Sequence, residues 1–160
     1  MNTVFWSCSL LVLPLADPTA DEILSEARKQ AAPRTQAALE GAAAALEKAT
    51  EKFGGDARVH AALSEFYSEL AYFGYAKPYD MARKAKAAAG KAIELNDASP
   101  EGHTALGMVQ LCYDWDFPKA EASFKKAIGK KADHAPAHAA YARCLVCMGK
   151  LKEAQDEAKK

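Results

Sequence analysis

The sequence predicts an all-α fold of stacked helix pairs, and three observations predict it. Alanine, the best helix former, occurs 36 times and is spread along the whole 160-residue chain. Valine, isoleucine and threonine, which favour strands, are scarce. Similar helix pairs also return at an interval of 35 residues in the C-terminal part. Such a repeat is typical of a solenoid, whose units bury their faces only against neighbouring units.

The length and charge exclude several function classes. A chain of 160 residues forms one domain by the usual size range. Lys plus Arg and Asp plus Glu both total 21, so the net charge is zero. This balance argues against binding to nucleic acid or to an anionic membrane, which needs a basic surface. No apolar stretch has the 18 to 20 or so residues that a transmembrane helix needs.

Two interpretations of residues 1–18 remain open. The apolar stretch Val4–Ala16 has the length of a signal-peptide core, although residues 1–3 include no Lys or Arg. Alternatively, Leu10–Leu15 is a short strand left from a neighbouring domain. The first interpretation predicts an extracytoplasmic protein and the second a cytoplasmic one.

Capping residues and turn signals divide the rest of the chain into helices. Thr19 to Glu22 form a capping box, and Thr35 and Asp56 precede two further helices. Asp80 is expected to cap a fourth helix, and Ser99 followed by Pro100 starts a fifth. Pro118, Pro136 and the Gly149 turn open three more. These helices group into an N-terminal segment (19–55, with a degenerate half repeat), a unit with an insertion (56–98), a unit (99–134) and a truncated unit (135–160).

Matching residues in the last two units are typical of two helices that cross in close contact. A small residue at the eighth position of each first helix, Gly107 or Ala142, lets the partner helix approach closely. The other matched pairs are His103 and His138, Leu106 and Tyr141, and Ala120 and Ala154.

These residues resemble the tetratricopeptide repeat. Its pattern W-x₂-L-G-x₂-Y…A-x₃-F…P is met in order by His103, Leu106, Gly107, Gln110, Ala120, Phe124 and Ala127. Gln110 stands where the pattern has Tyr, and Ala132 where it has Pro. The unit from residue 57 to 95 is a more distant match with about nine extra residues. The resemblance implies a right-handed α-α superhelix of about three units plus N-terminal helices.

Residues 34–160 are also similar to the repeat region of bacterial signalling and transcriptional regulators. That resemblance implies a binding or sensing part. No G-x-S-x-G, H-E-x-x-H or Walker pattern and no phosphate-binding glycine loop occurs, so we expect no enzyme activity, no cofactor and no metal. The leading hypothesis is a non-catalytic scaffold that binds a peptide or protein segment. The alternative is a regulatory fragment of a larger kinase, cyclase or transcription regulator, without activity of its own.

The resemblance places the binding groove on the first helices of the units. Their second, fifth, ninth and twelfth positions line the concave face of such solenoids. The candidate groove residues are Arg58, Glu65, Glu101, Thr104, Met108, Leu111, Ala139 and Arg143. The Lys and Asn set that grips a peptide carboxylate is absent, so we expect a peptide with apolar side chains.

An aromatic cluster in the insertion is a second candidate contact. Tyr72, Phe73, Tyr75 and Tyr79 are either an exposed anchor for a partner or rings that pack against the next repeat. We favour the second interpretation.

Other reactive residues have a structural interpretation that we favour. Cys144 and Cys147 are spaced like a redox pair or half a zinc site, but also like two small residues on a buried helix face. Asp114 and Asp116 are expected to act as caps, with Trp115 filling the gap between units.

Three histidines recur at one position of the repeat. His60, His103 and His138 occupy equivalent positions in successive units, so they cannot share one ion and are expected to bond within the helix pairs.

In the last helix, Leu151 and its neighbours Ala154 and Ala158 are expected to be incompletely buried. We therefore expect either a longer natural chain or self-association through this helix.

Overall fold

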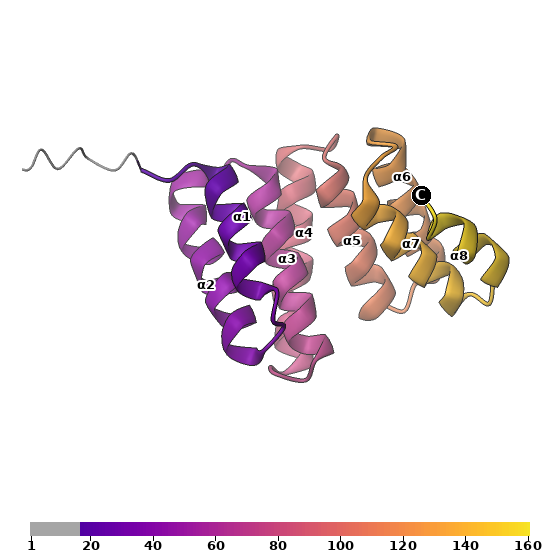
Figure 1. Cartoon of the computed structure of the whole chain (residues 1–160), viewed down its shortest axis with the longest axis horizontal. Helices are drawn as coiled ribbons and strands as arrows, with labels where there is room; N and C mark the ends of the chain where they lie inside the picture. The colour runs from indigo at the N-terminus through magenta and orange to yellow at the C-terminus, as the bar shows by residue number, and fades with distance from the viewer. Residues whose placement is uncertain (1–16) are drawn as a thin grey trace, which may run out of the picture.

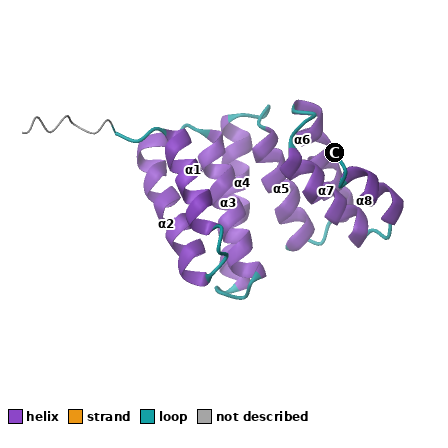
Figure 2. Cartoon of the chain, viewed as in Figure 1, coloured by secondary structure: helices purple, strands orange, loops and turns teal. Residues whose placement is uncertain are grey.

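The computed structural model describes residues 17–160, which form eight α-helices and no strand (Figures 1 and 2). The helices are α1 (Ala20–Ala31), α2 (Gln36–Phe53), α3 (Ala57–Tyr72), α4 (Pro78–Leu95), α5 (Pro100–Cys112), α6 (Phe117–Lys130), α7 (Ala135–Cys147) and α8 (Leu151–Glu157). The two interpretations of the N-terminal stretch fall on residues 1–16, outside the described residues.

The helices stack as antiparallel hairpins along one axis (Figure 1). α1 packs on α2, α3 on α4, α5 on α6 and α7 on α8, and each first helix also packs on the next hairpin. The predicted all-α solenoid is confirmed. We refer to the four hairpins of the described chain as units 1 to 4, because α1 pairs with α2 as the first helix of a complete hairpin.

Most predicted helix starts are confirmed by their caps. The Thr19 side chain accepts from the Glu22 amide, and Thr35, Asp56 and Ser99 accept in the same way at α2, α3 and α5. The expected cap at Asp80 is wrong. Pro78 already occupies the first turn of α4, where its missing N–H costs nothing, so Asp80 lies within that turn.

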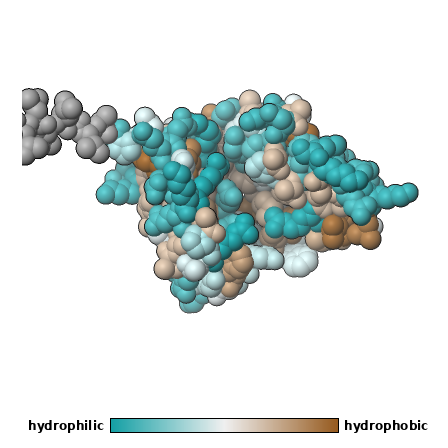
Figure 3. Space-filling model, viewed as in Figure 1, coloured by the Kyte–Doolittle hydropathy of each residue, from teal (hydrophilic) through white to brown (hydrophobic). Residues whose placement is uncertain are grey.

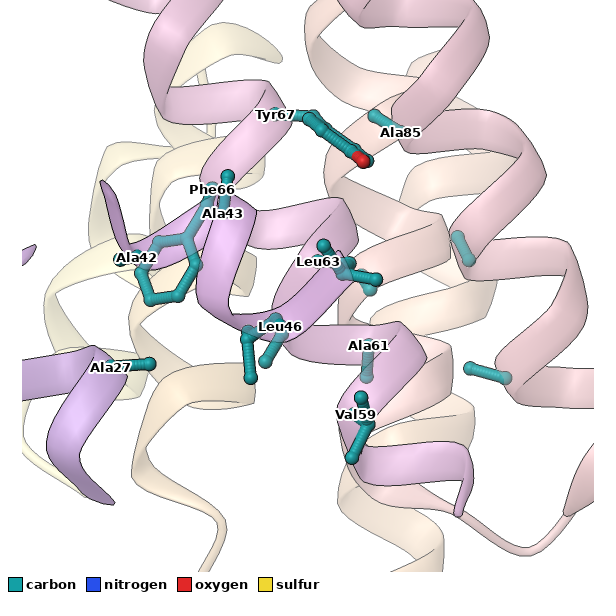
Figure 4. Close-up of a cluster of buried hydrophobic side chains, with 14 of the residues drawn as sticks. Ala27, Ala42, Ala43, Leu46, Val59, Ala61, Leu63, Phe66, Tyr67 and Ala85 are labelled. Atoms are coloured by element: carbon teal, nitrogen blue, oxygen red, sulfur yellow. The ribbon is translucent and has the colours of Figure 1, made fainter. Parts of the chain in front are cut away.

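The buried side chains form two clusters. Cluster 1 fills α1 to α4 and consists mainly of alanines around a few large residues such as Leu46 and Phe66 (Figure 4). It reaches α5 through Ala105 and Val109. Cluster 2 fills α5 to α8 and is centred on larger side chains such as Phe124. Helix α5 therefore belongs to both clusters through opposite faces.

Gly107 permits the closest helix contact in cluster 2. A Cβ atom at this position would lie 2.6 Å from a ring carbon of Phe124. Since carbon atoms in contact are normally about 3.5 to 4.0 Å apart, only glycine accommodates the ring without a shift. The predicted close approach at the eighth position is confirmed for this unit.

Candidate functional site

The first helices of the four units, α1, α3, α5 and α7, pack against one another in chain order, and we call the surface that they share the groove. The space-filling view is hollowed near the middle of this face (Figure 3). A hollow of about 590 Å³ lies at the N-terminal part of the groove. It is lined by Asp21, Leu24, Ser25, Arg28, Lys29, Ala32, Arg58 and Glu101.

Helix α1 supplies a wall of the groove that sequence reasoning missed. Asp21 and Arg28 occupy the second and ninth positions of α1, as Arg58 and Glu65 do in α3. The position rule that identified the residues on α3 would therefore have found those on α1. The sequence of α1 lacks the repeat signature that marks a first helix, so only its pairing with α2 in the structure shows that the rule applies to it.

Arg58 joins these two walls. Its guanidinium lies 2.5 Å from an Asp21 carboxylate oxygen and 2.7 Å from an Asp56 carboxylate oxygen. The hydrogen bonds that Arg58 donates to Asp56 and Asp21 raise the pKa of its guanidinium. Arg58 lines the hollow, and its charge is neutralised by two carboxylates of the same chain.

Two glutamates one helical turn apart form an acidic centre in the groove. Glu65 is exposed and Glu69 is half-buried, and the helices around them withdraw enough water to raise the pKa of both carboxyl groups. Arg34 approaches Glu69 at 3.7 Å. Within residues 17–160, no cation lies within 4.0 Å of the Glu65 carboxylate. The nearby Arg28 and Arg34 only partly offset the effect of burial on Glu65.

Helices α5 and α7 add a less charged wall. Met108 is half-buried and Ala139 is exposed. The Arg143 guanidinium nitrogen lies 2.8 Å from the Met108 sulfur, so the Arg143 side chain is directed toward α5. The positive charge of Arg143 also lowers the pKa of Glu69, though less than burial raises it.

Three further candidate residues are already engaged within the chain. The Thr104 hydroxyl donates to the Pro100 carbonyl at 2.7 Å, and Glu101 accepts from the Ser99 hydroxyl at 3.0 Å. Leu111 is only 5% exposed and belongs to cluster 2. We therefore leave Leu111 out of the binding surface considered below.

Each of the three equivalent histidines contacts the turn that precedes its own helix. Each Nε2 lies within hydrogen-bond distance of the carbonyl oxygen six residues earlier, at 3.0 Å for His60 and 2.8 Å for His103 and His138. The second ring nitrogen of His138 lies 2.7 Å from Glu157. The bond to Ala132 and this contact raise the pKa of His138. At Nε2 the histidines therefore bond to the turns between units rather than within the helix pairs, and the buried Nδ1 of His103 has no hydrogen-bond partner among the described residues.

The two cysteines of the C-x-x-C spacing differ in burial. Cys144 is fully buried, which raises the pKa of its thiol, whereas Cys147 is exposed.

Asp116 caps α6 by accepting from the Lys119 amide at 3.1 Å, as predicted. Asp114 is not a cap but an ion-pair partner of Lys86 on α4, at 2.9 Å.

Trp115 does not fill the gap between units as predicted. Its side chain is 72% exposed and its backbone has a positive φ of 53°. Tyr113 takes the expected place, because its ring packs against cluster 1 and its hydroxyl donates to the Ser68 carbonyl at 3.3 Å.

The aromatic cluster of the α3–α4 turn is more exposed than expected. Tyr72 is 75% and Tyr79 81% exposed, so packing of these two rings against the next repeat is wrong. Phe73 stacks on Tyr75 with ring centres 5.8 Å apart. The Tyr75 hydroxyl donates to the Arg34 carbonyl of unit 1, so this ring packs against the preceding unit.

Among residues 17–160, no helix is both long and apolar enough to span a membrane. Within the same range, no three His, Cys, Asp or Glu side chains gather in a way that suits a metal ion. The groove instead offers fixed charges of both signs beside apolar side chains.

Comparisons with known proteins identify the architecture. No protein-family model and no curated protein sequence matches the chain. The chain is similar in structure to TTC0263, a thermophilic TPR protein of Thermus thermophilus, with a TM-score of 0.72 and 22% identity over 86% of this chain and 69% of that chain. It is also similar to the MamA MSR-1 structure, with a TM-score of 0.51 and 20% identity over 89% of this chain and 77% of that one. The chain therefore has the tetratricopeptide-repeat fold.

Proposed function

We propose that the protein is a non-catalytic scaffold whose concave groove binds a segment of another protein. The observation that carries the proposal is the acidic centre of Glu65 and Glu69. Two carboxylates with raised pKa values lie in a groove whose own cations do not fully neutralise them. Such a site gains from a cation supplied by a partner, because the ion pair forms where water is partly excluded.

The rest of the groove narrows the chemistry of the partner. Met108 and Ala139 present apolar surface beside the acidic centre. A segment with a Lys or Arg next to one or two apolar side chains would use both features. Arg58 has its charge neutralised by Asp21 and Asp56, so an anionic group on the partner gains little there.

The proposal is tested with peptides selected on the protein itself. A phage-displayed library of random 12-residue peptides is panned on the chain, and the selected sequences are synthesised. We expect them to contain a Lys or Arg flanked by apolar residues. Their affinity is then measured by calorimetry for the chain and for Glu65→Lys. The matched control is Glu153→Lys, which makes the same change on α8, away from the groove.

We expect Glu65→Lys to weaken binding at least about tenfold, which corresponds to about 1.4 kcal/mol. Glu153→Lys should leave the affinity unchanged. Equal affinity for all three proteins would overturn the proposal, as would a library that yields no binder. Circular dichroism of both variants shows whether the helical fold is retained.

A further inference from the structure

His138 has a hydrogen-bond acceptor at each of its two ring nitrogens. Its Nε2 lies 2.8 Å from the Ala132 carbonyl oxygen, and its Nδ1 lies 2.7 Å from a Glu157 carboxylate oxygen. The Nε2 of His103 also lies at a carbonyl oxygen, but the buried Nδ1 of that ring has no partner among the described residues. A neutral imidazole carries one N–H, whereas an imidazolium carries two. Only the protonated ring can therefore donate in both contacts of His138.

The His138–Glu157 contact is shielded from water. The side chain of His138 is 5% exposed and that of Glu157 is 15% exposed, so either charge would be costly without the other. The Lys160 ammonium lies 2.8 Å from the second carboxylate oxygen of Glu157. Burial opposes ionisation of Glu157, but the hydrogen bonds from Lys160 and His138 outweigh it and lower the pKa below the ordinary value of 4.5. Glu157 therefore stays ionised at the pH values where His138 titrates.

The charged groups with the largest effect on the His138 ring are Glu157, which favours its protonated form, and Lys160, which opposes it. Other charged groups on the elements next to α7 bond elsewhere or are exposed. They include Glu101 on α5, Glu121 and Lys125 on α6, Lys150 before α8, and Lys131 and Asp133 in the turn before α7. The protonation of His138 is thus tied to its contact with α8.

We propose that His138 holds α8 against α7 in a pH-dependent way. The protonated ring donates to Ala132 and to Glu157 and so joins the turn before α7 to the end of α8. When the ring loses a proton, Nε2 keeps its N–H, as it must at the carbonyl oxygens next to His60 and His103. The lone pair of Nδ1 then faces a carboxylate, and Glu157 can move into water with α8.

This contact is a large part of what holds α8. Leu151 is 64% exposed and Ala158 is exposed, as predicted, but incomplete burial is wrong for Ala154, which packs in cluster 2. Ala154 is the one buried residue of α8. The other polar contact near the start of α8 is the pair of Lys150 with Glu121, at 3.3 Å.

The sign of the pH dependence follows from the two bonds. The bonds to Ala132 and to Glu157 raise the pKa of His138 above its ordinary value of 6.5. Because the folded-state pKa is raised, the contact stabilises the docked α8 fully below pH 6.5 and is lost as the pH rises through the folded-state value. The proposal does not depend on what the groove binds, so it can fail or hold separately from peptide binding at Glu65.

Nitrogen-15 NMR of the 160-residue chain, titrated from about pH 5 to about pH 9, tests the proposal. Both ring nitrogens of His138 should carry a proton at the acid end. The ring should lose its proton at a lower pH in Glu157→Gln than in wild type, because the glutamine amide carries no charge. The matched control is Glu153→Gln, the same change at an exposed position of α8, which should keep the wild-type midpoint.

Hydrogen exchange of α8, corrected for the intrinsic pH dependence of exchange, is the second readout. Protection of α8 in wild type should fall about tenfold as His138 loses its proton, which is the effect of losing one charge-assisted hydrogen bond. In Glu157→Gln it should be low throughout and should not follow the His138 titration.

Three results would overturn the proposal. Equal midpoints in wild type and Glu157→Gln would show that the carboxylate does not bind the ring. The same lowered midpoint in Glu153→Gln would assign the effect to the net charge of α8 rather than to the contact. Protection of α8 that is absent, or that does not follow the wild-type midpoint, would show that the contact does not hold the helix.

Discussion

The N-terminal half (α1 to α4) and the C-terminal half (α5 to α8) are built from the same hairpin but are stabilised differently. Helices α2 and α4 have 18 residues each, whereas α6 has 14 and α8 only seven. Cluster 1 contains many small alanines in close contact, and cluster 2 depends on fewer and larger rings. A single substitution in the C-terminal half therefore removes a larger share of its core.

Within each half, the two units are joined by a tyrosine whose hydroxyl donates to a glutamate of the preceding unit. The Tyr67 hydroxyl donates to Glu47 at 2.5 Å, and the Tyr141 hydroxyl donates to Glu121 at 2.9 Å. At the boundary between the halves, units 2 and 3 are joined through Tyr113 and through the exposed pair of Lys86 with Asp114. The comparison teaches that units of one fold can be joined by contacts of different chemistry, and the groove crosses the boundary between the two halves.

The largest expected effect comes from Phe124→Ala. This ring is fully buried at the centre of cluster 2, and its loss should lower the free energy of unfolding by about 3–5 kcal/mol. Hydrogen exchange should show faster exchange in α5 to α8 and little change in α1 to α3. Leu46→Ala is the matched change in cluster 1. Equal acceleration in both halves for either variant would show that they unfold as one unit.

Gly107→Ala should destabilise the same half by overpacking. The added Cβ would meet the Phe124 ring at 2.6 Å, so the ring must shift, at a cost of about 1–3 kcal/mol. The matched control is Gly129→Ala on α6, where an added Cβ meets nothing within 4 Å. Urea unfolding of the two variants measures the difference. A Gly107→Ala protein as stable as wild type would mean that the crossing is looser than described.

Glu121→Gln should remove a pH-dependent contribution of about 1–3 kcal/mol. Hydrogen bonds from Lys125, Tyr141 and Lys150 lower the pKa of Glu121 to about 2, from an ordinary value of 4.5. Because the folded-state pKa is depressed, the stabilisation is complete above pH 4.5 and is lost as the pH falls toward 2. Thermal unfolding from pH 7 to pH 2 checks this. The variant should be less stable than wild type at pH 7 and approach it in acid, and a constant difference would contradict the assignment.

The smallest expected effect is that of Lys86→Ala at the boundary between the halves. Its pair with Asp114 is exposed, so the loss should be at most about 0.5 kcal/mol and should shrink in high salt. Urea unfolding at low and high salt measures it. A loss above 2 kcal/mol would mean that this pair, rather than Tyr113, holds the halves together.

The fold could be predicted because its signals are local. Caps such as Thr19 and Ser99, and the small residue at Gly107, act within a few residues or at a fixed repeat position. The ring that faces inward was predicted to be Trp115, but it is Tyr113. Both aromatic residues belong to one turn, and only the path of the backbone decides which ring faces inward.

The candidate groove could be predicted only in part. The repeat positions predict Glu65, Met108 and Arg143 as groove residues, and in the structure they lie on the first helices α3, α5 and α7. The partners of Arg58 could not be found in the same way, because Asp21 lies 37 residues earlier, on a helix that was not assigned to a unit. The acidic centre depends on burial by neighbouring helices, which raises the pKa of Glu65 and Glu69.

Hydrogen exchange of the chain with and without a selected peptide is the most direct test of the central claim, that the groove and not the aromatic turn binds the partner. The account predicts slower exchange in α3 and α5, on both sides of the boundary between the halves, and no change around Tyr72 and Tyr79. Protection confined to the α3–α4 turn would contradict it and would assign binding to the exposed aromatic rings.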